Sequence, residues 1–155
     1  HSGLTKRQVT LQIACVGEAG AAQPRLGLLC RGTDAILKRE RHLYDPRDWV
    51  GFQKKAWMDR KTQLKWFDEV VEPYLQDNYK QENGTVLETL GLYDSLDASE
   101  CVEFVQRAAK LNHRVGHGPC GETEHWQPVD FGGIGKLLVD LIKMEQDKWL
   151  VKKRN

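Results

Sequence analysis

The first apolar runs of the chain predict a pair of strands. Residues 8–16 alternate apolar and polar side chains and include several β-branched residues, a pattern typical of a half-buried strand. A turn rich in Gly and Ala follows over residues 17–24, and residues 25–30 form a second apolar run. The two runs therefore predict an antiparallel hairpin.

The middle of the chain follows a helical period. Within residues 54–75, apolar side chains recur on one face, which indicates an amphipathic helix: Leu64, Phe67, Val71 and Leu75. We expect Trp57 to extend this face upstream, and Pro73 to bend or end the helix. Residues 34–51, which precede the helix, have no regular period and contain an Asp-Pro-Arg turn signal, so they predict irregular structure.

The second half of the chain alternates predicted strands and helices. Residues 86–93 are an apolar run whose second half we expect to be a buried strand, and residues 114–116 suit another short strand. Residues 97–111 predict a helix with a capping box at its start and four inward-facing side chains: Asp97 and Glu100, then Cys101, Phe104, Val105 and Ala108. Residues 134–149 predict a final helix with one broad apolar face: Ile134, Leu137, Leu138, Leu141, Ile142 and Trp149. The order β-β-α-β-α-β-α predicts an α/β layered domain.

Length and composition narrow the classes of protein that this chain can represent. With 155 residues, 40% of them hydrophobic, it is long enough for one domain with its own core. The formal net charge of +1 excludes a strongly basic nucleic-acid binder but leaves room for a local basic groove. No apolar run reaches the roughly 20 residues that span a bilayer, so we expect no membrane partner. The sequence opens at His1 without Met, so we expect it to be part of a larger fold.

Two aspartates stand out as candidate site residues. Asp94 follows the apolar run of residues 86–93, and Asp130 follows Pro128 at the start of the final predicted helix. Carboxylates at a strand end and a helix start can hold divalent cations such as Mg²⁺. Each aspartate also has a structural alternative, because Asp94 suits a turn and Asp130 suits a helix N-cap. Asp97 competes with Asp94 for the role of ligand.

Other clusters have simpler explanations. Three candidate zinc ligands lack the partner pair that ordinary zinc spacing requires: His117, Cys120 and His125. Four basic residues flank Trp57 and form either a solvated helix face or a set of phosphate contacts: Lys54, Lys55, Arg60 and Lys61. We expect the tryptophans to be core or boundary aromatics, with base stacking as the lesser alternative.

Five segments of the chain, taken in order, carry a family resemblance. Two segments are similar to a pair of strands in the family: residues 8–11 (Gln-Val-Thr-Leu) and 24–32 (Pro-Arg-Leu-Gly-Leu-Leu-Cys-Arg-Gly). A third segment is similar to the start of a helix in the family: residues 53–59 (Gln-Lys-Lys-Ala-Trp-Met-Asp). Residues 92–98 (Leu-Tyr-Asp-Ser-Leu-Asp-Ala) and 127–130 (Gln-Pro-Val-Asp) are similar to two segments that carry acidic residues. Together they resemble the C-terminal portion of a DDE superfamily endonuclease domain, in the pogo/Tigger/Jerky-like transposase group that includes the centromere protein B relatives.

The resemblance implies an α/β, RNase H-like layered domain over residues 1–155, incomplete at its N-terminal strand. It also implies three carboxylates that bind two Mg²⁺ or Mn²⁺ ions for phosphodiester cleavage and strand transfer. Asp94 would be the second of these catalytic, metal-binding residues and Asp130 the third. The first lies on a strand before residues 8–16, so we expect this chain alone to be inactive. Ser95 stands where the family usually has Asn, and Glu124-His125 where it more often has Asp-Leu.

The resemblance further implies DNA as the partner, nuclear localisation and, in the parent protein, a homo-oligomer. Whether the protein is an enzyme stays open at this point. One alternative is a domesticated, catalytically inactive DNA-binding or protein-interaction module of the same fold. Another is an unrelated small α/β domain in which both aspartates are caps.

Overall fold

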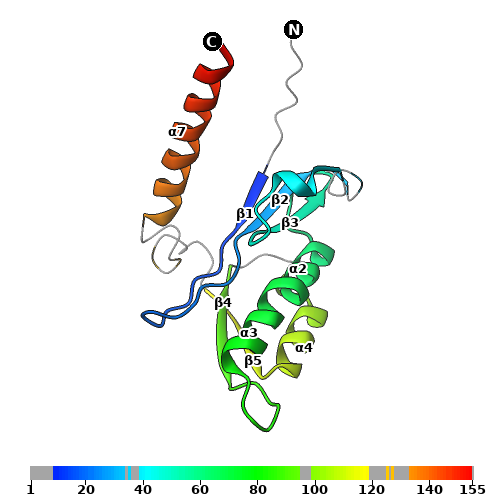
Figure 1. The fold of residues 1–155 in the computed structure, drawn as a ribbon. Coiled ribbons are helices and arrows are strands. Elements are labelled where there is room, and N and C mark those ends of the chain that lie inside the picture. The colour runs from blue at the N-terminus through cyan, green and yellow to red at the C-terminus, as the bar shows by residue number, and fades with distance from the viewer. Residues whose placement is uncertain are drawn as a thin grey trace. The chain divides into compact units, whose positions relative to one another are not determined.

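The computed structural model is a mixed α/β protein, as the order of the predicted elements indicates. It describes residues 9–33, 35, 39–94, 99–118, 125, 127 and 133–154. The chain divides into two compact units, His1–Gly116 and His117–Asn155 (Figure 1).

The predicted hairpin is confirmed. Strand β1 (Val9–Gln12) pairs antiparallel with strand β2 (Gly27–Arg31), and Val9 lies opposite Cys30. At the other end of the pair, Gly27 allows Gln12 of β1 and the side chain of Trp66 to come close to the β2 backbone. A Cβ atom at Gly27 would lie 2.8 Å from Gln12 Cβ and 3.2 Å from Trp66 Nε1. The pairing of β1 with β2 therefore depends on the missing side chain at Gly27.

A third strand extends this sheet where we predicted irregular structure. Strand β3 (Trp49–Gln53) pairs parallel to β2, after the 3₁₀ turn η1 (Arg41–Leu43). Trp49 is buried, its ring lies over Gly51, and its Nε1 donates to Glu69 Oε2 at 2.6 Å. These contacts come from distant parts of the chain. A five-residue run with a central glycine gives too weak a local pattern to reveal them.

The predicted central helix begins later than its sequence pattern suggests. It consists of α2 (Arg60–Trp66), the π-helical turn η2 (Phe67–Val71) and α3 (Glu72–Tyr79). Asp59 caps it, because its Oδ1 accepts hydrogen bonds from the backbone N and Oγ1 of Thr62 at 2.9 and 2.7 Å. Trp57 lies before this cap and is 71% exposed. The prediction that Trp57 extends the apolar face is therefore wrong.

Pro73 does not end the helix, because the π-helical turn accommodates it. Proline has no N–H, so the carbonyl of Glu69, four residues earlier, loses its usual helical donor. In η2 the chain instead bonds over five residues, with Glu72 N–H donating to Phe67 O. The Arg25 guanidinium donates to Glu69 O and so satisfies the carbonyl that Pro73 leaves free.

The next elements form a strand–helix–strand unit. Strand β4 (Thr89–Tyr93) and strand β5 (His113–His117) pair in a two-stranded sheet, and α4 (Val102–Lys110) connects them. The positions of both predicted strands are confirmed. The predicted burial of β4 is wrong, because Leu90 and Leu92 are exposed on its outer face. Helix α4 has Cys101 as its N-cap, with no side-chain capping bond, so the helix starts later than predicted. Asp97, which was predicted to form the capping box with Glu100, lies outside the described residues.

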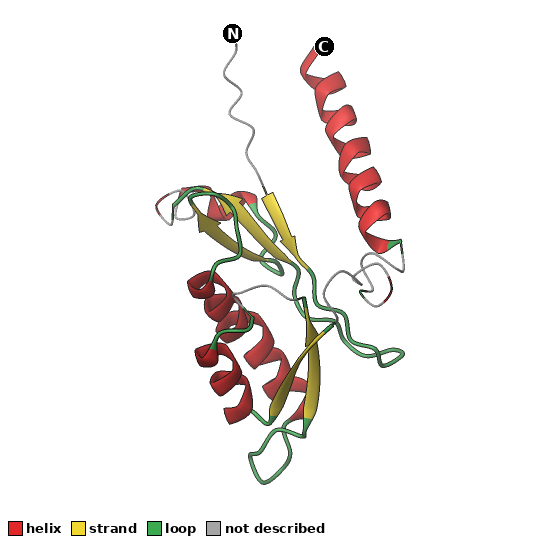
Figure 2. Cartoon of the chain, turned by 180° about the vertical axis from the view of Figure 1, so that it is seen from behind, coloured by secondary structure: helices red, strands yellow, loops and turns green. Residues whose placement is uncertain are grey.

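The core of the first unit lies between the helices and the strands, and the helices stand together on one side of β4 and β5 (Figure 2). Phe67 of η2 and Phe104 of α4 meet edge to face, with ring centroids 5.2 Å apart. Both side chains are fully buried, and the other members of the core cluster are also buried: Leu29, Trp49, Trp66, Val70, Val71, Leu75, Val86 and Ala108. The inward positions predicted for Phe67, Val71 and Leu75 are confirmed. Val105 is 41% exposed, so its predicted inward position is wrong.

The second unit contains one long helix. Helix α7 (Ile134–Arg154) confirms the predicted final helix and extends beyond it. Leu137, Leu141 and Ile142, predicted to share an apolar face, are each about half exposed. None of the helices among the described residues is long and apolar enough to cross a membrane.

Truncating Phe104 tests the assignment of the inner face of α4. We expect Phe104→Ala to lower the free energy of unfolding by about 3–5 kcal/mol, because it removes a ring that packs between two helices. The adjacent Val105→Ala is the matched control and should cost less than about 1 kcal/mol, since Val105 is partly exposed. Urea unfolding measures both. Equal losses for the two variants would contradict the orientation of α4.

Candidate functional site

Asp94, one of the two predicted site residues, directly follows strand β4. Its side chain is exposed, whereas the preceding Tyr93 turns into the core. The backbone carbonyl of Asp94 accepts a hydrogen bond from Ser99 Oγ at 2.8 Å, and Ser99 is buried. This bond ties the chain after β4 to the start of the α4 region. The Asp94 carboxylate therefore leaves a fixed strand end and faces solvent.

Strands β4 and β5 begin at the same end of their sheet. Thr89 N–H, at the start of β4, donates to the carbonyl of Asn112, which immediately precedes β5, at 3.1 Å. Glu88 and Arg114 form an ion pair at the same end. The carboxyl ends of the two strands therefore lie together at the opposite end of the sheet, and Asp94 follows β4 there. α/β proteins commonly bind ligands at the carboxyl ends of their parallel strands.

The other candidate ligands are only partly described. Asp130 and Cys120 lie outside the described residues. His117 ends β5, and its Nε2 atom is buried without a hydrogen-bond partner among the described residues. His125 is exposed. Within the described part of the chain, no three His, Cys, Asp or Glu side chains gather closely enough to hold a metal ion.

A buried polar network behind Asp94 was not predicted from the sequence. His113 of β5 is only 6% exposed, and its Nδ1 lies 2.7 Å from Thr89 Oγ1. Its Nε2 lies 3.0 Å from the hydroxyl of Tyr93. Gly91 makes room for the imidazole, because a Cβ atom there would lie 2.5 Å from His113 Nε2. Thr89, Gly91 and Tyr93 occupy alternate positions on one strand face, which is the sequence signal that could have revealed the network.

Burial sets the protonation of this network. It lowers the pKa of His113 and raises the pKa of the Tyr93 hydroxyl, because the interior solvates both charged forms less well than water does. A neutral imidazole has one N–H donor and one bare nitrogen. One hydroxyl therefore donates to the ring and the other accepts from it. The network holds β4 against β5, so we assign it a structural role.

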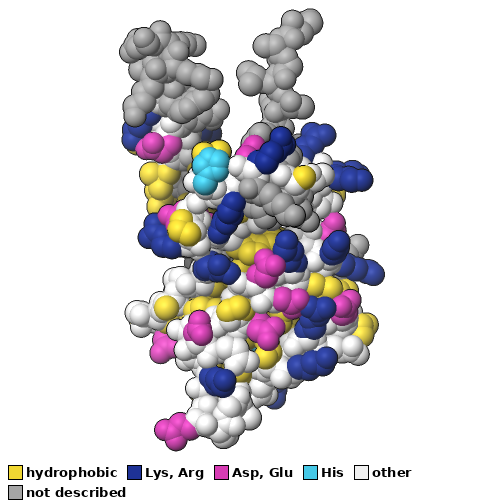
Figure 3. All heavy atoms as spheres, turned by 45° about the vertical axis from the view of Figure 1, so that its right-hand side comes forward, with side chains coloured by type: hydrophobic (Ala, Val, Ile, Leu, Met, Phe, Trp, Pro, Cys, Tyr) yellow, Lys and Arg dark blue, Asp and Glu magenta, His cyan; other side chains and the backbone are white. Residues whose placement is uncertain are grey.

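A shallow groove lies beside α2 and α4 in the first unit. Asp68 and Glu103 line it, and both carboxylates pair with Arg107 of α4. Glu69 is also engaged, through Trp49 Nε1. Figure 3 shows Lys and Arg side chains interspersed with Asp and Glu on one face of the molecule rather than gathered by sign. The groove therefore offers basic side chains but no unengaged carboxylate pair.

The buried imidazole predicts a pH-dependent stability. An unfolded His titrates near pH 6.5, and folding lowers the pKa of His113, so the unfolded chain binds the proton more tightly. Stability is then complete above about pH 6.5 and falls below it, with a slope of at most about 1.4 kcal/mol per pH unit. Unfolding in urea from about pH 7.5 to about pH 5.5 measures this slope.

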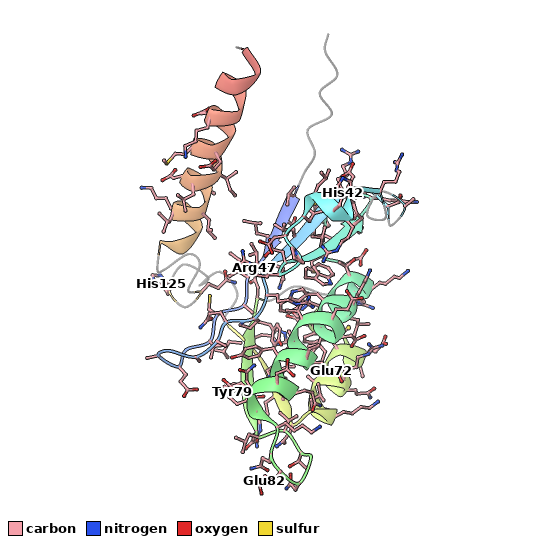
Figure 4. The ribbon with its side chains drawn as sticks, in the orientation of Figure 1. His42, Arg47, Glu72, Tyr79, Glu82 and His125 are labelled. Carbon is pink, nitrogen blue, oxygen red and sulfur yellow. The ribbon has the colours of Figure 1, made fainter. Side chains whose placement is uncertain are left out.

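The matched variants are His113→Asn and His42→Gln. His42 is exposed in η1, away from β4 and β5 (Figure 4). The His113 variant should be less stable but should lose stability less steeply in acid, whereas the His42 variant should keep the original slope. An unchanged slope in His113→Asn would contradict the assignment of a neutral buried imidazole.

Comparison with known proteins supplies no relative from which a site could be transferred. No family model, no characterised protein and no solved structure matches this chain. The function of the protein must therefore be inferred from its own residues and their geometry.

Proposed function

We propose that the chain is part of a DDE-type DNA endonuclease domain with an RNase H-like fold. In this proposal Asp94 is the second carboxylate of a two-metal site and Asp130 is the third. The parent protein would cleave DNA phosphodiester bonds and join a DNA 3′-hydroxyl to a target strand, in the nucleus. The ions would be Mg²⁺ or Mn²⁺, which prefer carboxylate oxygens as protein ligands.

The observation that carries this proposal is the position of Asp94. It is exposed at the carboxyl end of β4, beside a second strand that runs in the same direction and is reached through helix α4. Among the described residues no ion pair engages Asp94, and the carboxylate is therefore available to a hard cation.

In this proposal the chain supplies two carboxylates, those of Asp94 and Asp130, to the metal site. Bound metal ions would activate the attacking oxygen and neutralise charge on the leaving oxygen. Asp94 contributes a ligand whose direction is set by β4, and the Ser99 bond holds the backbone at that point. With two of three carboxylates, the chain by itself should bind metal weakly and leave DNA intact.

Mn²⁺ binding tests the role of Asp94. We expect Asp94→Asn to weaken Mn²⁺ binding about tenfold or more, because a neutral amide replaces a charged ligand. Asp77→Asn is the matched control, since Asp77 is an exposed aspartate of α3 and should leave Mn²⁺ binding unchanged. Isothermal titration calorimetry measures both affinities.

Two outcomes would contradict the proposal. One is equal Mn²⁺ affinity in the Asp94 variant, the Asp77 variant and the unmodified chain. The other is robust nicking of supercoiled DNA by the purified chain with Mn²⁺, which would require a complete site elsewhere. If the parent protein binds DNA but never cleaves it, the inactive DNA-binding module of the same fold becomes the better description.

A further inference from the structure

Among the three tryptophans whose side-chain exposure the structure describes, Trp57 is the most exposed, and it lies on a short segment between β3 and α2. The indole is 71% exposed, whereas Trp49 and Trp66 are at most 4% exposed. Tryptophan has a large apolar surface that proteins usually cover, either in the core or against a partner. An indole held in solvent is therefore a candidate contact for another molecule.

The backbone that carries Trp57 is tightly held by hydrogen bonds. Gln53 Oε1 accepts from the backbone N–H groups of Lys55, at 2.6 Å, and Trp57, at 3.2 Å. Gln53 Nε2 donates to Asp59 Oδ2 at 3.1 Å. Asp59 N–H in turn donates to the Trp57 carbonyl at 3.0 Å. The loop is thus bonded on both sides of the tryptophan.

Ala56 fixes the same segment at the cost of backbone strain. Its φ of 56° lies in the left-handed region, which alanine rarely occupies, and its side chain is only 1% exposed. Thr10 Oγ1 of β1 donates to the Ala56 carbonyl at 2.6 Å. Ala56 is thus buried while the next residue, Trp57, is exposed. Strained backbone that is held this firmly often marks a functional position.

Basic residues flank Trp57 on both sides in the sequence. All four are exposed, and no ion pair among the described residues includes them: Lys54, Lys55, Arg60 and Lys61. The one acid of the segment, Asp59, is already occupied by Thr62 and Gln53. The whole chain has a formal net charge of only +1, so this concentration of positive charge is local.

We propose that this segment, residues 53–61, binds single-stranded nucleic acid. An unpaired base stacks on the Trp57 indole, and the neighbouring phosphates contact the flanking Lys and Arg side chains. Stacking on an aromatic ring combined with a cationic track is the usual chemistry of single-strand binding. A protein partner would instead call for an apolar segment, whereas four of the nine residues 53–61 are Lys or Arg.

The inference rests on the proposed function for the nature of the polymer, which would be DNA with unpaired bases. The contact itself needs no metal ion, because neither the indole nor the cations are metal ligands. Binding can therefore be measured in EDTA, where the two-metal site contributes nothing.

Fluorescence anisotropy with a labelled oligothymidine of about 12 nucleotides is the test. We expect Trp57→Ala to lower the affinity about five- to 100-fold, and Trp57→Phe to retain most of it. Val102→Ala is the matched control, since Val102 is 70% exposed on α4 and should leave the affinity unchanged. The urea midpoint of Trp57→Ala should stay near that of the unmodified chain, because the indole is exposed.

The cations are tested by salt dependence. Replacing Lys54 and Lys55 with Gln should reduce the slope of log affinity against log salt by about 0.7 for each phosphate that the variant no longer neutralises. Lys80→Gln is the control, because Lys80 is an exposed lysine on the other side of the α2–α3 helical run in sequence. Its slope should match that of the unmodified chain.

Three results would overturn the inference: no binding of the oligonucleotide, equal affinity in Trp57→Ala, or an equal loss in Val102→Ala. A Trp57 variant that loses only the binding of a protein partner would also overturn it. Asp94→Asn should bind the oligonucleotide normally in EDTA. If the metal-site proposal is wrong, the Mn²⁺ titrations show it. If the nucleic-acid proposal for residues 53–61 is wrong, the oligonucleotide binding measured in EDTA shows it.

Discussion

The packing of four rings fixes how the helices of the first unit meet β4 and β5. Phe67 contacts Phe104 edge to face at 5.2 Å, and Phe104 contacts Tyr93 at 5.1 Å. His113 closes the group, with its ring 6.2 Å from Phe67 and 6.1 Å from Tyr93. Edge-to-face aromatic pairs are directional as well as apolar, so the cluster sets both position and angle. Because Tyr93 immediately precedes Asp94, the same cluster determines where the candidate ligand leaves the strand.

Glu69 links the helical run to the other sheet. Its carboxylate accepts from Trp49 of β3, and its carbonyl accepts from Arg25 before β2. The carbonyl is free because Pro73, four residues later, has no N–H. A residue that would interrupt an isolated helix therefore creates an acceptor that the tertiary structure uses. The π-helical turn is the local adjustment that makes both contacts compatible with a continuous helix.

The sequence predicted the elements whose stability follows from their own periodicity. The apolar face through Phe67, Val71 and Leu75 and the hairpin were both evident from spacing. Strand β3 was missed because it depends on pairing with β2 and on the Trp49–Glu69 bond, which no local pattern encodes. The helix start was misplaced because the apolar period continues upstream to Trp57, whereas the Asp59 cap decides where the helix begins.

The candidate site, like the fold, was predictable only in part from the sequence. The position of Asp94 at a strand end followed from the apolar run before it, and that position agrees with the structure. The polar network of His113 was missed, because its partners come from β4 and only alternate positions hint at them. Asp130 lies outside the described residues, so its pairing with Asp94 remains a proposal.

The central claim, that Asp94 and Asp130 share a metal ion, is tested most directly by paramagnetic broadening in solution. Mn²⁺ added to the isotopically labelled chain broadens the amide signals of residues close to the bound ion. If the two aspartates share an ion, the amide signals of two separate segments should broaden selectively: residues 93–95 and residues 129–131. This broadening should be lost in Asp94→Asn. Broadening at only one of these segments, or centred elsewhere, would contradict the shared site.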